Sequence, residues 1–147
     1  MPSGYGWQFC DSSSNFPTSS AIRAGRDSDG CTIYVGRAFH ENDLLPAKVI
    51  PDKNIAFVTY AGEEIPKTDF EVLRSGDFVW EFAMNGTIPS GAIMIGKTMD
   101  GEPLYMGRCL YEGTQTPGKV QESHGCLYIP FNGEEISITE YEILVLK

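Results

Sequence analysis

AIRAGRDSDGCTIYVGRA, residues 21–38, recurs as AIMIGKTMDGEPLYMGRC, residues 92–109. The correspondence continues without a gap over residues 21–73 and 92–144, where 19 of the 53 aligned pairs are identical. Two further blocks belong to it: LLPAKV matches QTPGKV, and AGEEIPKTDFEVL matches NGEEISITEYEIL. The chain is therefore a tandem duplication.

The two copies are expected to form a single domain. With the tryptophan that precedes each of them, the repeats span residues 7–73 and 80–146. A solenoid needs three or more repeats to bury its faces, so two copies fit better as halves of one core around a pseudo-twofold axis. A chain of 147 residues suits one such domain. We expect one domain over residues 1–147, with Trp7 and Trp80 largely buried as near-equivalent core anchors.

The local pattern predicts an all-β fold. Glycine and proline are frequent, and no window of helical length keeps a 3.6-residue apolar period free of both. Asp29-Gly30 and Asp100-Gly101 predict the tight turn of a hairpin in each copy. Gly36-Arg37 and Gly107-Arg108 indicate a bulge, with the arginine binding a carboxylate or a carbonyl. We predict about seven short strands per copy, arranged as an antiparallel β-sandwich of two layers.

The charge and hydropathy exclude several classes of partner. The chain has 20 acidic and 11 basic residues and a net charge of −9, without a run of lysine or arginine, so neither nucleic acid nor an anionic membrane is expected to bind. No apolar run approaches the ~20 residues of a membrane span. The first residues lack the basic and apolar segments of a signal peptide. We expect a cytoplasmic protein, or one released to the cell surface or beyond by a non-classical route.

The residue pattern predicts no metal site, cofactor or catalytic site. None of the four cysteines has a cysteine at the equivalent position of the other copy, and no CxxC occurs, so we expect free thiols. The sequence 27–30, DSDG, lacks the remaining ligands of a calcium loop. Glu63-Glu64 and Glu134-Glu135 are adjacent on an extended chain and face opposite sides, unlike a glycosidase pair. His40 and His124 are not repeat equivalents and have no neighbour at metal-ligand spacing. We therefore expect no enzyme.

The lysines of the two P-x-K segments are candidate binding residues. Lys48 follows Pro46 and Lys119 follows Pro117, in a chain that contains few lysines. We expect both segments to be loops held by proline and glycine, from which the lysine reaches a ligand. The alternative is a solvated lysine or a salt bridge to nearby acids.

These blocks resemble the DM9 repeat family, once called DUF3421. The resemblance rests on the AIRAG…DG…YVGRA, LLPAKV and GEE…FEVL blocks, each found twice, on the tryptophan lead-in, and on the IPSGAI segment at Ile88–Ile93. It covers Trp7 to Leu146. The similar stand-alone oyster proteins are all-β, intertwine their two repeats, form dimers, and act as mannose-binding lectins in immune recognition of microbes.

The resemblance also implies a sugar site. The family's sugar contacts include an aspartate just after the AIRAG strand and the lysine of the P-x-K segment, which correspond here to Asp27 and Lys48. In the second copy Thr98 departs from the pattern, so a second site would rely on Lys119 with nearby Asp100. A carboxylate accepts hydrogen bonds from neighbouring sugar hydroxyls and an ammonium donates to their oxygens, each such bond contributing about 1.5–3 kcal/mol.

The residue pattern and the resemblance suggest three candidate functions for the chain. The first is a calcium-independent lectin for mannose or mannose-rich glycans on microbial surfaces, which gains affinity by multivalency as a homodimer. The alternative is an intracellular vesicle- or stress-associated DM9 interaction protein without sugar binding. A pore-forming protein is disfavoured, because no extension supplies an aerolysin-like module.

Overall fold

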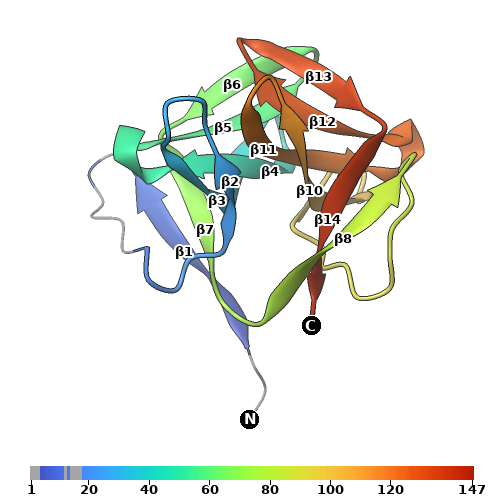
Figure 1. The fold of residues 1–147 in the computed structure, drawn as a ribbon, viewed down its shortest axis with the longest axis horizontal. Helices are drawn as coiled ribbons and strands as arrows, with labels where there is room; N and C mark the ends of the chain where they lie inside the picture. Colours follow the sequence, from blue (N-terminus) through green and yellow to red (C-terminus); the bar gives the residue numbers. More distant parts are fainter. Residues whose placement is uncertain (1–3, 12, 14–17) are drawn as a thin grey trace.

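Strands make up most of the chain that the computed structural model describes, which is residues 4–11, 13 and 18–147 (Figure 1). The first repeat supplies β1 (Tyr5–Asp11), β2 (Arg23–Arg26), β3 (Thr32–His40), β4 (Asp43–Ile50), β5 (Ile55–Tyr60), β6 (Glu63–Lys67) and β7 (Asp69–Ser75). The second supplies their counterparts, β8 (Phe78–Met84), β9 (Gly96–Lys97), β10 (Pro103–Tyr111), β11 (Thr114–Gln121), β12 (Cys126–Phe131), β13 (Glu134–Ile138) and β14 (Glu140–Leu146). Short 3-10 helices follow β4 and β11, η1 (Pro51–Lys53) and η2 (Glu122–His124). The predicted all-β fold, with seven strands per copy, is confirmed. Within these described ranges, no helix is long and apolar enough to cross a membrane.

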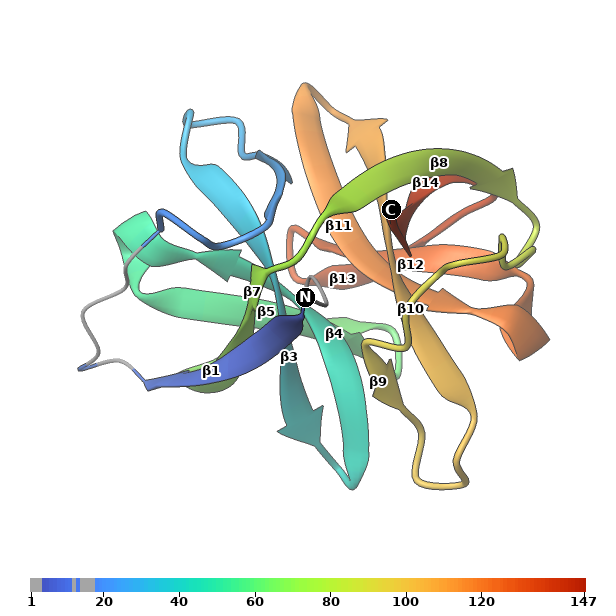
Figure 2. The ribbon, with the colours of Figure 1, turned by 90° about the horizontal axis from the view of Figure 1, so that it is seen from below.

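The two repeats are intertwined in one antiparallel sheet of 14 strands. Its order is β1-β7-β3-β2-β11-β12-β13-β6-β5-β4-β9-β10-β14-β8, which reads the same from both ends when each strand is replaced by its counterpart. Strand β2 pairs with β11 of the other repeat at Arg26 and Gln115, and β9 pairs with β4 at Lys97 and Leu44. In Figure 2 the counterparts β1 and β8 lie on opposite sides of the molecule. Each repeat therefore completes the sheet of the other.

The predicted hairpin turns are present in both copies. Gly30 and Gly101 have φ angles of 89° and 94°, the left-handed region that glycine adopts without a steric penalty. Asp29 Oδ1 accepts a hydrogen bond from the backbone N–H of Cys31 at 3.1 Å. Aspartate before the turn glycine is thus explained by local hydrogen bonding to the backbone.

The predicted bulge at the two Gly-Arg pairs is wrong. The β3–β4 register runs without a shift through Gly36, and the β10–β11 register through Gly107. Glycine is needed because the neighbouring strand approaches closely: a Cβ on Gly36 would lie 2.6 Å from the carbonyl oxygen of Glu71 and 2.4 Å from Val49 Cγ2.

The predicted P-x-K loops are wrong as well, because Lys48 lies in strand β4 and Lys119 in β11. A proline inside a strand removes one donor, so it is tolerated only where the strand has an unpaired side. Among the described residues β9 pairs with β4 at Leu44, and β5 pairs with it from Lys48 onward, so that side of β4 is open at Pro46.

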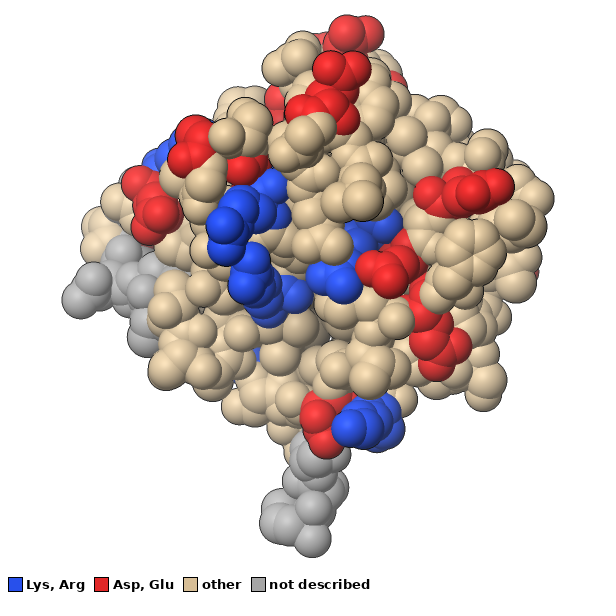
Figure 3. Space-filling view, in the orientation of Figure 1, with Lys and Arg blue, Asp and Glu red and all other residues tan. Residues whose placement is uncertain are grey.

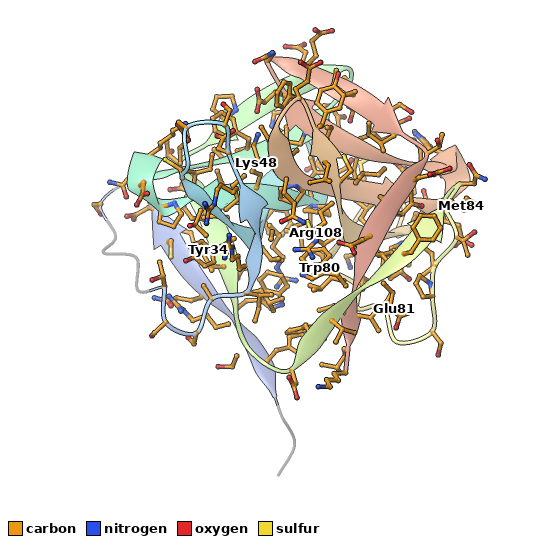
Figure 4. The ribbon with its side chains drawn as sticks, in the orientation of Figure 1. Tyr34, Lys48, Trp80, Glu81, Met84 and Arg108 are labelled. Carbon is orange, nitrogen blue, oxygen red and sulfur yellow. The ribbon has the colours of Figure 1, made fainter. Side chains whose placement is uncertain are left out.

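The two tryptophans are equivalent and lie partly buried in the structure. Both pack at the edge of a core that joins the repeats, whose buried members include Ile33, Ile95 and Leu144. An arginine covers one face of each ring. The guanidinium carbon of Arg37 lies 3.9 Å from the Trp7 ring centre. That of Arg108 lies 4.1 Å from the Trp80 ring centre (Figure 4).

All four cysteines are free thiols, as the repeat alignment predicts. Cys10 and Cys126 are buried, and Cys31 and Cys109 are half-buried. Burial raises the pKa of the Cys109 thiol to about 11 and also raises the pKa of Cys10. These thiols behave as small apolar side chains of the strands that carry them.

Candidate functional site

Lys48 (labelled in Figure 4) is buried where the two repeats meet. Its Nζ donates a hydrogen bond to the backbone oxygen of Pro130 in β12 at 2.9 Å, and lies 3.4 Å from Oε2 of Glu64 in β6. The other carboxylate oxygen of Glu64 accepts a bond from the N–H of Gly133 at 2.8 Å. The Lys48–Glu64 pair therefore ties the first repeat to β12 and the β12–β13 turn of the second.

Lys119 repeats this arrangement from the other side. Its Nζ lies 3.4 Å from Glu135 Oε2 and donates to the backbone oxygen of Thr59 at 3.3 Å, while Glu135 Oε1 accepts from the N–H of Gly62. The copies differ in one respect, because Thr59 stands where the second copy has Pro130. Within the part of the chain that the structure describes, the buried Thr59 hydroxyl has no hydrogen-bond partner, and neither does Glu135 Oε2, for which the lysine 3.4 Å away is an ion-pair partner only.

Both lysines thus form the salt bridge to nearby acids that was the alternative interpretation of their sequence. Their partners, Glu64 and Glu135, were not predicted from the sequence. A signal was available: in each copy the lysine and the second glutamate of the GEE block are 16 residues apart. A sugar contact of Lys48 and Lys119 stays a prediction.

Asp27 lies in an exposed charge cluster beside the first hairpin turn. Lys53, at the end of η1, places its Nζ 2.7 Å from Asp29 Oδ2 and 3.5 Å from Asp27 Oδ2. Hydrogen bonds from Lys53 and from the N–H of Cys31 lower the pKa of Asp29 to about 2, and the bond to Asp29 raises the pKa of Lys53. The lysine in contact with Asp27 is therefore Lys53, in η1, and not Lys48, in the preceding strand β4.

The second copy has no equivalent cluster. Asp100 is exposed and forms no ion pair within the described residues, whereas Lys119 is buried against Glu135. Thr98, the counterpart of Asp27, accepts a bond from the N–H of Glu102 at 3.1 Å. His124 replaces Lys53, and its Nδ1 lies 2.9 Å from the Tyr128 hydroxyl. In the described part of the chain, no group of three or more histidine, cysteine, aspartate or glutamate side chains could hold a metal ion.

A small basic patch lies beside the charge cluster of Asp27, Asp29 and Lys53. It consists of Arg23, Arg26 and Arg108. Arg23 and Arg26 are exposed on β2 and form no ion pair among the described residues. Arg108 Nη1 donates to the backbone oxygen of Ala24, between them, at 3.2 Å. Figure 3 shows basic side chains gathered over β2 on this face. The patch arises from tertiary packing, which explains why the sequence has no run of basic residues.

The arginine of each Gly-Arg pair binds a carboxylate and a carbonyl, as predicted. Arg37 Nε lies 2.7 Å from Glu71 Oε1, and its Nη1 donates to the backbone oxygen of Ile95 at 3.1 Å. Arg108 makes the corresponding 2.9 Å contact with Glu142. Each arginine, like each buried lysine, bonds a carbonyl of the other repeat.

Comparison with known proteins identifies the family. The DM9 repeat model matches residues 26–138, which is more than half of the chain. The structure resembles the crystal structure of the nematode sperm cell motility protein MFP2B, with a TM-score of 0.69 and 12% identity over 98% of this chain and 47% of that chain. This chain therefore spans about half the length of MFP2B, and at this identity the likeness concerns the fold alone. No curated protein matches the sequence. The chain belongs to the DM9 repeat family.

Proposed function

We propose that the chain is a calcium-independent carbohydrate-binding protein that recognises mannose or mannose-rich glycans. The observation that carries the proposal is the Asp27–Lys53 pair, a carboxylate and an ammonium 3.5 Å apart at the surface. Neighbouring hydroxyls of one sugar ring need an acceptor and a donor side by side. The Asp-Gly turn and η1 hold the two charges in place, so little conformational entropy is lost on binding.

Lys48 can contact a sugar only after a rearrangement of its present contacts. The family resemblance assigns it a sugar contact, but its side chain is 5% exposed and its ammonium already bonds Pro130 and Glu64. A sugar therefore reaches Lys48 only if it displaces one of these partners. We also propose a second site at Lys119 and Asp100. It would be weaker, because Lys119 is buried in the same way and Asp100 forms no ion pair among the described residues.

Mannose titration of matched variants tests the first site. Asp27→Asn should keep the fold and weaken binding by about 10–100-fold, the loss of one charge-assisted hydrogen bond. Asp29→Asn is the control and should mainly loosen the turn. Comparing Lys53→Met with Lys48→Met then identifies the lysine that contacts sugar. If Asp27→Asn binds mannose like the parent, the site assignment is wrong. A glycan array with and without EDTA checks both the ligand class and the independence from calcium.

We further propose that the protein acts as a homodimer in innate immune recognition of microbes, from the cytoplasm or after non-classical release. A single shallow sugar site binds at about millimolar, so recognition of a glycan surface needs several sites acting together. Sedimentation measurements of the parent test the dimer directly.

The alternative is a DM9 interaction protein, associated with vesicles or stress, that binds no sugar. MFP2B, which shares the fold, is described as a sperm cell motility protein and not as a lectin, so the fold alone does not require a sugar ligand. An array without any bound glycan, together with an unchanged spectrum of the protein in excess mannose, would favour this alternative over the lectin.

A further inference from the structure

Each repeat carries a surface groove, and the two grooves are equivalent. The first, of about 630 Å³, lies among Phe9, Arg37, Phe39, Leu44 and Glu71. The second, of about 440 Å³, lies among their repeat counterparts Phe82, Arg108, Leu110, Gln115 and Glu142. None of these residues belongs to the charge cluster around Asp27.

Large apolar side chains border both grooves and remain exposed. Phe9 and Phe39 are 61% and 69% exposed, and Phe82 and Leu110 are 64% and 81% exposed. A single exposed apolar residue is ordinary, but a pair of them beside a groove, present in both copies, indicates a binding surface.

The grooves also present unused polar atoms. Phe9 lies opposite Glu71 on the neighbouring strand, and Glu71 lies opposite Arg37, so the three side chains share one face. The ion pair uses Nε of Arg37 and Oε1 of Glu71, and Nη1 bonds Ile95. Among the described residues, Nη2 of Arg37 and Oε2 of Glu71 have no hydrogen-bond partner.

Exposed aromatic rings next to unpartnered polar atoms favour one kind of ligand in the groove over others. An apolar side chain, whether from a peptide or from a second copy, would bury Nη2 and Oε2 without partners. A pyranose ring fits these three side chains: its C–H face stacks on the exposed phenylalanine, and adjacent hydroxyls donate to Glu71 and accept from Arg37.

We propose that the grooves are a pair of sugar subsites, separate from the Asp27 cluster, that each bind a ring of an oligosaccharide. The first groove, with two phenylalanine walls, binds more tightly than the second, where Leu110 replaces Phe39. The inference rests on the proposed carbohydrate ligand but not on the Asp27 assignment.

Mannotriose titration followed by backbone amide NMR tests the proposal. In the parent, amides near Phe9 and Phe39 should shift, and Asp27→Asn should leave those shifts unchanged. Phe39→Leu, which copies the second groove, should weaken binding to the first by about 3–10-fold. Leu110→Phe should strengthen the second groove by a similar factor, a gain that a merely structural role would not produce.

The outcomes separate this inference from the proposed function. Shifts near Asp27 without shifts in either groove overturn the subsites alone. Absence of all shifts overturns both the subsites and the lectin. If Phe9→Ser changes the sedimentation coefficient but not the mannotriose shifts, the groove is a protein contact and the inference is wrong.

Discussion

Replacing Lys48 by methionine would leave the Glu64 carboxylate in a buried site without its counter-ion. The two side chains are 5% and 12% exposed. Removing one partner of a buried ion pair costs about 3–5 kcal/mol, because the remaining charge stays buried and unpaired. Glu64 keeps its hydrogen bond from Gly133, so we expect the lower end of this range, about 3 kcal/mol. For a domain of this size each kcal/mol lowers Tm by roughly 2–4 °C, which gives an expected loss of about 6–12 °C.

Thermal and urea unfolding of a small set of variants measures this cost. Lys119→Met should lose a similar amount, because its pair is equivalent. The double variant Lys48→Met with Glu64→Gln should regain part of the loss, since it removes both charges. Lys53→Met is the control: its ion pairs are at the surface, and the change should stay below about 1 kcal/mol. If Lys48→Met also stays below about 1 kcal/mol, the ammonium does not hold the repeats together, and the structural explanation of this lysine is refuted.

Three further predictions concern single positions. Gly36→Ala should destabilise the protein by about 2 kcal/mol or more, because its Cβ would meet backbone 2.6 Å away, whereas Gly6→Ala has no atom within 4 Å of its Cβ and should be neutral in a urea melt. Thiol titration of the unfolded, unreduced protein should find four thiols; in the native protein at pH 8, Cys109 should react slowly, because burial raises its pKa to about 11. The Asp29 carboxyl should titrate near pH 2 in an NMR series. Because the pKa of Asp29 is lowered from 3.8, the hydrogen bonds of its carboxylate stabilise the turn above pH 3.8 and are lost as pH falls toward 2. A titration midpoint near 3.8 would contradict the Lys53 contact.

Features that depend on neighbouring residues were predictable from the sequence. The internal repeat gives equivalent strands, and the Asp-Gly turns give the hairpins, because both depend on short stretches of chain. The P-x-K segments were predicted as loops because proline disfavours strands in general. Whether a proline is tolerated in β4 depends on where that strand is paired. Among the described residues, β9 of the other repeat pairs with one side of β4 at Leu44, and β5 pairs with it only from Lys48 onward, which leaves that side open at Pro46.

The candidate site was predicted only in part, for the same reason. Asp27 was chosen through the family resemblance. Its contact with Lys53 could not be predicted, because the position of Lys53 depends on how η1 packs against the first hairpin. The burial of Lys48 depends on the carbonyl of Pro130, 82 residues away in the other repeat. No local pattern specifies such a contact, whereas the recurring spacing of Lys48 and Glu64 does indicate that the two belong together.

The contacts between repeats explain why the duplication is needed for the fold. Each buried lysine and each Gly-Arg arginine bonds a carbonyl of the opposite copy, and β2 and β9 each pair with a strand of the opposite copy. A single repeat would leave these cations without acceptors and these strands with an open edge. The two halves are therefore one folding unit.

This requirement constrains where the two copies can differ. The buried lysine–glutamate pair, Lys48–Glu64 or Lys119–Glu135, is the same in both copies, because each pair helps to pack its copy against the other copy. The surface residues carry no such constraint: Asp27 faces Lys53 in the first copy, whereas Thr98 and His124 occupy these positions in the second. If the proposed function holds, we expect the two copies to differ in sugar preference through these surface residues. A sugar that depends on the carboxylate and the ammonium should bind mainly to the first repeat, even though the core of the molecule is symmetric.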